Sequence, residues 1–251
     1  MSGIVAEINK IPPITRTLCL SMAAVSLPVI MNLYGFYRVA WIWPSVRYQF
    51  EIWRAFTTMF IEVGGINFIF MIATLYRTSN ELETVSYAGR PADYVWQMFL
   101  SVIGILLLNA KRTNVLIHTR AFLCALSYIN SALAPAGAMT SLFGLVTFPV
   151  IYWPYVFVAL DLLNGGPHAG ATAMSGAVIG HLWWWGAWEA RAVRPALNAP
   201  NFLRRLMGQT GGGEPVRMGG GVSVVTPRQV RDADARAGDG HSWGSGRRLG
   251  R

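Results

Sequence analysis

Long apolar runs are the feature that most constrains this sequence. Of its 251 residues, 53% are hydrophobic and only 13% are charged, about half the charged share of a soluble domain. A segment that crosses a bilayer needs about 20 largely apolar residues, or about 17 where the bilayer is thin. The composition therefore predicts an all-α membrane protein. The two cysteines lie in apolar runs, so neither a disulfide framework nor a metal site or cofactor is expected.

Six stretches are long and apolar enough to be candidate transmembrane helices. They cover residues 17–34, 55–76, 95–110, 115–133, 141–163 and 170–188. The first lacks the short basic segment and cleavage site of a signal peptide, so we expect it to remain as a helix. The second carries Glu62 and a pair of glycines near its start, which suggests a half-submerged entry followed by a helix from about Asn67. The fifth is broken by Pro149 and Pro154.

Six spans place both termini on one side of the membrane. Of the 21 Lys and Arg residues, 11 follow residue 188, against 5 of the 12 acidic residues. Such a basic excess favours cytosolic termini, although arginines in the predicted lumenal loops weaken the rule here. The predicted organisation is a cytosolic N-terminal segment, a membrane domain, a disordered basic tail and a terminal peptide. These parts cover residues 1–16, 17–188, 189–240 and 241–251.

The basic tail could suggest nucleic acid as a partner. It contains no groove-reading module and no interleaved aromatic residues, so no nucleic-acid binding is expected. Its Gly, Arg, Pro and Asp content cannot bury enough apolar surface to offset the entropy of ordering, which is why the tail is predicted to be disordered.

A Trp-Arg pair, Trp53-Arg54, precedes the second span. At a membrane interface such a pair can act simply as an anchor. In the functional interpretation, protein carbonyls or lipid headgroups hold Arg54 so that it orients the whole first loop. The sequence leaves both interpretations open.

The sixth span contains Gly176 and Gly180, followed directly by His181. Small residues four apart allow membrane helices to approach closely. In a membrane-embedded serine protease of the rhomboid type, a histidine here would be the general base for the serine of a Gly-x-Ser motif. Neither Ser127 nor Ser131 in the fourth span has a glycine two residues before it. We therefore predict no catalytic residue, and His181 is interpreted as a structural donor.

Polar residues inside the predicted spans are candidates for function, because they are expensive to place in a membrane. Glu62, Asn67 and Arg120 are the main candidates. Together with Arg54 and His181, they are predicted to surround an intramembrane polar cavity.

Several segments, in the correct order along the chain, resemble the derlins, which are rhomboid-fold proteins that lost protease activity. Besides the Trp-Arg pair and the Gly-x-x-x-Gly-His motif, the similar segments are IPPITR (11–16), GINFIFMIATLYRTSNELE (65–83), GRPADYV (89–95) and TSLFGLVTFPVIYWPYV (140–156). The resemblance covers roughly residues 11–190. The fourth-span exit, INSALAPAGAMT, lacks the Asn-Pro and the charged residues common in derlins.

The resemblance implies a six-helix rhomboid-like bundle in the endoplasmic-reticulum membrane and a non-catalytic role in endoplasmic-reticulum-associated degradation. Its implied partners are misfolded client proteins, the lipid bilayer, an endoplasmic-reticulum membrane ubiquitin ligase complex and, in one form of assembly, further copies of the chain. The terminal peptide HSWGSGRRLGR resembles an SHP box, which docks on the hexameric AAA+ segregase valosin-containing protein. The matching positions are Trp243, Gly244, Gly246, Arg247, Arg248 and Leu249.

The expected mechanism is physical. Short, polar-interrupted spans thin the bilayer, and a polar cavity lowers the cost for a hydrophilic client segment to enter. Two alternatives remain: a scaffold that only recruits the segregase and the ligase, and an intramembrane serine protease with an unusual nucleophile. A passive solute channel is disfavoured because no span carries a repeated polar face.

Overall fold

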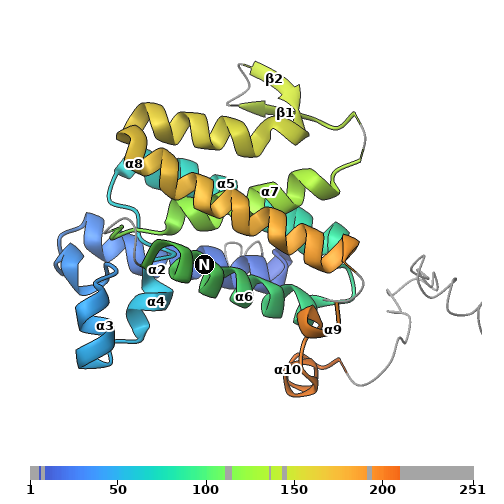
Figure 1. Ribbon diagram of the computed structural model, residues 1–251, viewed down its shortest axis with the longest axis horizontal. Helices are drawn as coiled ribbons and strands as arrows, with labels where there is room; N and C mark the ends of the chain where they lie inside the picture. Colours follow the sequence, from blue (N-terminus) through green and yellow to red (C-terminus); the bar gives the residue numbers. More distant parts are fainter. Residues whose placement is uncertain are drawn as a thin grey trace, which may run out of the picture. The chain divides into compact units, whose positions relative to one another are not determined.

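The computed structural model describes residues 6, 9–110, 115–135, 137–142, 146–190 and 194–209, and these are mostly helical (Figure 1). The predicted docking peptide, with Trp243, Gly244, Gly246, Arg247, Arg248 and Leu249, lies outside the described residues. The long helices are α2 (Pro13–Ile30), α5 (Gly65–Glu81), α6 (Pro91–Ala110), α7 (Thr119–Leu133) and α8 (Trp153–Trp184).

Short elements connect and flank these helices. Before α5 lie η1 (Phe36–Arg38), α3 (Trp43–Gln49) and α4 (Trp53–Thr57). Two π-helical turns, η2 (Leu82–Ser86) and η4 (Trp185–Glu189), extend α5 and α8. The remaining elements are β1 (Met139–Leu142), β2 (Val146–Pro149), η3 (Val150–Tyr152), α9 (Arg194–Leu197) and α10 (Asn201–Leu206).

Helix α8 consists of two arms that meet at Gly166. This residue has φ 71° and ψ −169°, a backbone conformation that glycine adopts without steric cost. Pro167 follows, and its missing N–H costs nothing in the first turn of the second arm. The two arms lie side by side in Figure 1, drawn in yellow and orange. They correspond to the predicted fifth and sixth spans.

The predicted fifth span, residues 141–163 broken by Pro149 and Pro154, is helical only from Val150 onward, first as η3 and then as α8. Its first part is an antiparallel hairpin in which β1 pairs with β2, with Met139 opposite Pro149. Proline lacks a backbone N–H and clashes with the preceding turn, so a helix cannot run through Pro149. The helix starts only at Trp153, where Pro154 occupies a first-turn position that tolerates proline.

Two of the described helices, α2 and α6, are long and apolar enough to cross a membrane. Helix α5 has 17 residues and α7 has 15, fewer than the about 20 that span an average bilayer, and α8 is divided at Gly166. The six-span bundle therefore remains a prediction.

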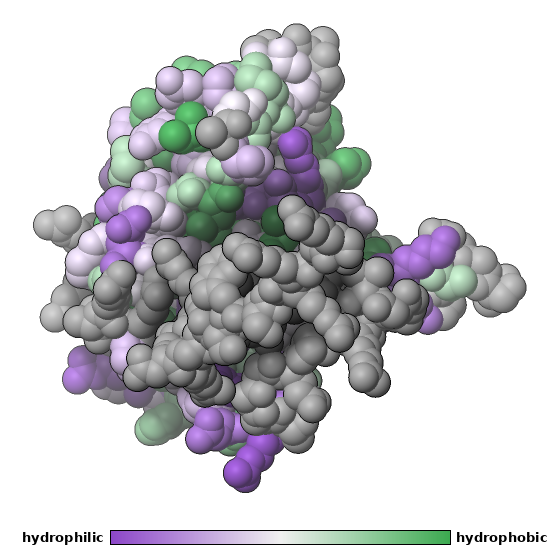
Figure 2. All heavy atoms as spheres, turned by 90° about the vertical axis from the view of Figure 1, so that its right-hand side faces the viewer, coloured by the Kyte–Doolittle hydropathy of each residue, from purple (hydrophilic) through white to green (hydrophobic). Residues whose placement is uncertain are grey.

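Helix α7 runs through the centre of the body, and residues 121–127 are all buried. The outward sides of other helices expose large apolar residues, such as Ile66 (86% exposed) and Leu163 (81%). On the face seen in Figure 2, apolar residues adjoin a group of hydrophilic ones. A buried central helix surrounded by outward apolar side chains is the arrangement expected where lipid replaces water as the surrounding medium.

The prediction that disorder begins at residue 189 is wrong for residues 194–209, which form α9 and α10. This segment docks on α6. Asp93 Oδ1 accepts hydrogen bonds from Ala199 N (2.9 Å) and Arg204 Nη2 (3.2 Å), and Gln97 Nε2 donates to Leu197 O (3.1 Å). Composition underestimated the order here because the partners that hold the segment lie about 100 residues earlier in the chain.

Candidate functional site

The Trp-Arg pair begins α4, and its two side chains point in opposite directions. Trp53 is 55% exposed, whereas Arg54 is buried. Arg54 Nη1 donates to the carbonyls of Tyr37 (2.5 Å) and Ala40 (2.8 Å), and Arg54 Nε donates to Glu51 Oε2 (2.7 Å). Arg54 therefore connects three points of the first loop, which is the geometry of a loop-orienting residue.

The same loop is hydrogen-bonded to the start of α7 through residues that were not predicted from the sequence to be important. His118 Nδ1 lies 3.0 Å from Thr58 Oγ1, and His118 N donates to Thr58 O at 3.0 Å. Thr119 Oγ1 donates to Ile61 O at 2.6 Å. Each of these hydrogen bonds joins residues about 60 positions apart in the sequence, so no local motif predicts them.

Gly176 and Gly180 pack against α7. A Cβ atom at Gly176 would lie 2.0 Å from the carbonyl oxygen of Ala121, and one at Gly180 would lie 2.7 Å from Tyr128 Cβ. The obstacle at Gly176 is a backbone atom, which a rotamer change cannot move. The spacing of small residues thus allows the second arm of α8 to touch the central helix.

His181 lies beside the same helix but not in a cavity. Its Nδ1 is 2.7 Å from Tyr128 Oη, and its ring packs edge-on against that tyrosine. His181 is exposed, and Ser127 and Ser131 make no hydrogen bond with it in the described structure. The contact between the two side chains ties α8 to α7.

A cavity of about 190 Å³ lies between the start of α5, the start of α7 and the end of the first arm of α8. We call it the Arg120 pocket. It is lined by Ile66, Asn67, Phe70, Met71, Arg120, Phe157, Leu160, Asp161 and Asn164. Most of the lining is apolar, with one ion pair and two amides at its polar end.

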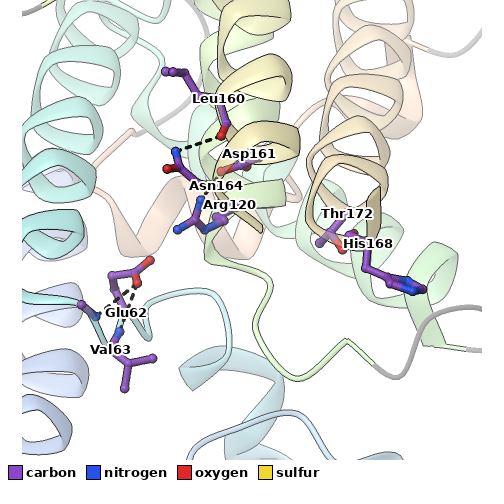
Figure 3. A network of polar contacts seen from close by, with 9 residues as sticks. Glu62, Val63, Arg120, Leu160, Asp161, Asn164, His168 and Thr172 are labelled. Atoms are coloured by element: carbon purple, nitrogen blue, oxygen red, sulfur yellow. Dashed lines mark hydrogen bonds and ion pairs between the residues drawn. The ribbon is translucent and has the colours of Figure 1, made fainter. Parts of the chain in front are cut away.

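The ion pair joins Arg120 Nη1 to Asp161 Oδ1. The Asp161 side chain is only 3% exposed, and its second oxygen, Oδ2, has no hydrogen-bond partner among the described residues. Glu62, also buried, lies across from Arg120 on the loop before α5 (Figure 3). Its carboxylate accepts from Val63 N (3.2 Å) and Gly64 N (3.4 Å).

The structure brings together only part of the predicted cavity. Asn67 and Arg120 line the Arg120 pocket, and Glu62 faces it (Figure 3). Arg54 is occupied by loop carbonyls and His181 by Tyr128, so the prediction that these two share the cavity is wrong. Arg54 and His181 contact partners that are far from them in the sequence, so the spacing of residues along the chain could not predict these contacts.

Asp161 is the residue that the sequence analysis missed in this pocket. It stands alone in the apolar run VFVALDLLNG, and an acid inside such a run is a functional candidate by the rule that singled out Arg120. Within the described ranges, no group of three or more His, Cys, Asp or Glu side chains is placed to hold a metal ion.

A second cavity, of about 230 Å³, lies between α5, α7 and the β-hairpin. Its polar lining includes Arg77, Glu81 and Asn130. Asn130 Nδ2 donates to Glu81 Oε2 at 2.9 Å. The hydroxyl of Ser141, which also lines this cavity, has no hydrogen-bond partner among the described residues. A hydroxyl is neutral, so leaving it unpaired costs less free energy than leaving the carboxylate oxygen of Asp161 unpaired.

A second polar cluster was also missed, and we call it the tyrosine network. Its members, all buried, are Thr15, Ser79, Glu83, Tyr87, Tyr94, Gln97 and Trp183. Trp183 Nε1 donates to Gln97 Oε1 (2.8 Å) and to Tyr87 Oη (3.0 Å), and Tyr87 Oη donates to Gln97 Oε1 (2.6 Å). Burial raises the pKa of Tyr87 well above its ordinary value, so the phenol keeps its donated proton.

Glu83 completes the tyrosine network at the first helix. Its carboxylate accepts from Ile14 N (3.0 Å), Thr15 N (2.7 Å) and Thr15 Oγ1 (2.8 Å). These are the unpaired donors at the start of α2, and a carboxylate there is favoured by the helix dipole. The exit of α5 therefore caps the beginning of α2.

Comparison with known proteins fixes the family. The model of the Der1-like family matches residues 11–188, about the extent of the described body. This chain belongs to the Der1-like family. It is 31% identical to mouse Derlin-1, over 100% of the chain and 99% of that protein. It is also 31% identical to a probable derlin-2 homolog from Dictyostelium discoideum, over 79% of the chain and 81% of the relative, and 30% identical to Derlin-1 from Arabidopsis thaliana, over 87% and 84%.

Membership of the derlins supports a general role in endoplasmic-reticulum-associated degradation at the endoplasmic-reticulum membrane. It also places this derlin in a rhomboid-like family generally regarded as inactive. The described geometry adds the Arg120 pocket, a mostly apolar cavity with one ion pair and two amides at its polar end.

Proposed function

We propose that this derlin assists the return of misfolded proteins from the endoplasmic reticulum to the cytosol and breaks no bond itself. The observation that carries the proposal is the Arg120 pocket, where an ion pair between the partly exposed Arg120 and the buried Asp161 lines a cavity between helices of a membrane protein. Buried charges in a membrane are expensive and usually line a path for polar cargo. Gly-x-Ser is absent from the fourth span, which supports a non-catalytic role.

The short helices supply the second part of the mechanism. Helix α7 has 15 residues, so it is about 22 Å long, against a hydrocarbon thickness of about 30 Å. In the proposed six-span arrangement, the bilayer thins around such helices at a modest cost per ångström of mismatch. A thinner bilayer and a hydrated pocket lower the barrier for a client segment to cross.

The proposed topology has both termini in the cytosol, so the terminal peptide meets the hexameric segregase there. The SHP-box-like residues support this partner: the glycines allow an extended strand to lie close to a sheet edge, and Trp243 and Leu249 fill separate pockets. One copy binds weakly because ordering costs free energy, whereas several copies on one hexamer gain effective concentration. A Trp243→Ala variant is expected to lose segregase binding in a pull-down from solubilised membranes.

The role of the first loop gives a direct test of retrotranslocation. Arg54→Gln removes the bonds to the carbonyls of Tyr37 and Ala40. We expect slower turnover of a misfolded client at unchanged expression, measured by pulse-chase in cells. Arg47→Gln, an exposed arginine of the same loop, is the matched control. Turnover that is the same in both variants contradicts the proposal.

Two experiments separate this function from the alternatives. In the scaffold alternative, residues 210–251 grafted onto an unrelated single-span anchor restore client turnover, whereas our proposal predicts that the graft only recruits the segregase. In the protease alternative, a fluorophosphonate probe labels a serine of the membrane domain, and our proposal predicts no labelling there.

A further inference from the structure

We propose that the Arg120 pocket binds the basic side chain, Lys or Arg, of a membrane-associated client segment, with Asp161 Oδ2 as the acceptor. This inference rests on the proposed function and names the class of client that the pocket selects. The starting observation is an unsatisfied atom. Asp161 lines the cavity, its side chain is 3% exposed, and its Oδ2 has no partner among the described residues.

A buried carboxylate oxygen is costly when it lacks a hydrogen-bond donor. Arg120 occupies the other oxygen, Oδ1, and so holds the carboxylate in place with its free oxygen unsatisfied. The missing group must therefore be a donor. A client carboxylate or a purely apolar client side chain cannot supply one.

The charges around the pocket favour a cation over a neutral donor. By formal charge, Arg120 contributes one positive charge and Asp161 and Glu62 together contribute two negative charges, and Glu62 faces Arg120 across the gap (Figure 3). The three groups together are short of one positive charge. A client ammonium or guanidinium supplies both the missing charge and a charge-assisted hydrogen bond.

The remaining lining fits the rest of such a side chain. Phe70, Phe157 and Leu160 present apolar surface on which the methylene stem of a lysine or arginine packs. Asn67 and Asn164 add amide oxygens near the charged end. A volume of about 190 Å³ corresponds to roughly six water molecules, which admits one long side chain and excludes a whole helix.

The position of the pocket suits a client that arrives from the lumen. Asn67 and Arg120 lie in the first turns of α5 and α7, and Asp161 lies near the end of the first arm of α8. With cytosolic termini, these helix ends all lie on the lumenal side. Ile66, at the rim, is 86% exposed, so the pocket is accessible from the outside of the bundle.

The test uses the full-length chain in proteoliposomes and three membrane-spanning probe peptides of about 20 residues. Each is a leucine-rich helix that carries a photo-crosslinker and, near its lumenal end, a single Lys, Glu or Leu. Crosslinking yield to the wild-type chain is expected to be about tenfold higher for the Lys probe than for the Leu probe, as one charge-assisted hydrogen bond would give. The Glu probe is expected to give no more than the Leu probe.

Two variants test whether the preference comes from this pocket. Asp161→Asn keeps the shape but removes the charge, and Ile66→Trp blocks the rim. Each is expected to reduce the yield of the Lys probe to that of the Leu probe. Ile69→Trp is the matched control, because Ile69 lies on the same helix, is 66% exposed and does not line the pocket. If Asp161→Asn does not fold, the comparison of Ile66→Trp with Ile69→Trp still shows whether the Lys preference comes from this pocket.

Equal yields for the three probes, a preference for the Glu probe, or a Lys preference that survives Ile66→Trp overturns the inference. Turnover of a soluble lumenal client is followed in cells with the chain present and deleted. If deletion has no effect on that client, the proposed function fails. If deletion slows turnover but the probes are bound equally, only the pocket's selectivity fails.

Discussion

The tyrosine network and the Arg120 pocket are both polar clusters among apolar helices, but they differ in how completely their groups are paired. In the tyrosine network, Glu83 accepts three hydrogen bonds, and Tyr87, Gln97 and Trp183 bond to one another. None of its buried side-chain polar atoms lacks a partner in the described part of the chain. In the Arg120 pocket, one carboxylate oxygen of Asp161 remains unpaired.

The difference in pairing suggests different roles, stability for the tyrosine network and ligand binding for the Arg120 pocket. A fully paired network rigidifies the helices that supply it, because any displacement breaks several bonds together. An unpaired buried acceptor costs free energy until a donor arrives, and in the Arg120 pocket the proposed donor is the basic side chain of a client. Substitutions in the tyrosine network should therefore affect stability, and those in the pocket should affect client selection.

The largest effect is expected where α8 packs on α7, since Gly176 lies directly against the backbone of this central helix. Gly176→Leu pushes a side chain into the carbonyl of Ala121, and overpacking alone costs about 1–3 kcal/mol even where neighbours can adjust. We expect most of the protein to be lost from detergent extracts in size-exclusion chromatography. Gly104→Ala is the control, because its Cβ meets only the flexible tip of Ile179 at 3.0 Å. A monodisperse Gly176→Leu protein would show that the arms can separate from α7.

The next effect tests the comparison directly. Glu83→Gln leaves one acceptor oxygen where the carboxylate served three donors, so we expect a loss of about 1–3 kcal/mol in the free energy of unfolding. Asp161→Asn keeps an acceptor oxygen for Arg120, whose side chain is 21% exposed and can therefore be hydrated, so it should cost less. Thermal unfolding in detergent measures both. A larger loss for Asp161→Asn than for Glu83→Gln would reverse our assignment of the two clusters.

A smaller loss of stability is expected for Trp183→Phe. The substitution removes the indole N–H that donates to Tyr87 and Gln97, and each net hydrogen bond is worth about 1 kcal/mol. Trp185→Phe, two residues on and 47% exposed, provides the matched control. Equal melting temperatures for the two variants would place Trp183 outside the stabilising network.

The smallest effect concerns the docked segment 194–209. Asp93→Ala removes the acceptor of Ala199 N and Arg204 Nη2. The body should keep its melting temperature, while trypsin should cut faster after Arg204 and Arg205, as followed by mass spectrometry. Glu189→Ala, an exposed acid nearby, serves as the control. Cleavage at the wild-type rate would mean that bonds other than those of Asp93 hold the segment.

The helices were largely predictable from the sequence, whereas the partners of their polar residues were not. Apolar runs located α2, α6 and α7 to within about four residues, and the helix expected from about Asn67 within the span 55–76 begins at Gly65. The hairpin was missed because β1 and β2 lie in or next to the apolar stretch 141–163, where Pro149 is the sign that a helix cannot continue. In a short apolar run, proline placement carries more information than hydropathy.

The candidate site shows the same limit. The spacing of Gly176 and Gly180 predicts a close contact, but only the fold shows that Ala121 lies there. Arg120 and Asn67 were identified as polar interruptions, while the lone acid Asp161 was overlooked although the same rule applies to it. Tyr87 and Trp183 are 96 positions apart and match no motif, so their contact depends on tertiary structure alone.

The docking of residues 194–209 on α6 has a mechanical consequence. Tension applied to the chain beyond residue 209 is borne first by this segment, whose side-chain and backbone bonds end on Asp93, Gln97 and Trp96 of α6. The load would therefore reach α6 before it reaches α8, the helix to which the tail is covalently connected. These few bonds would have to break before a force on the tail acts on α8. They would therefore protect the contact of α8 with α7, and the neighbouring Arg120 pocket, from such a force.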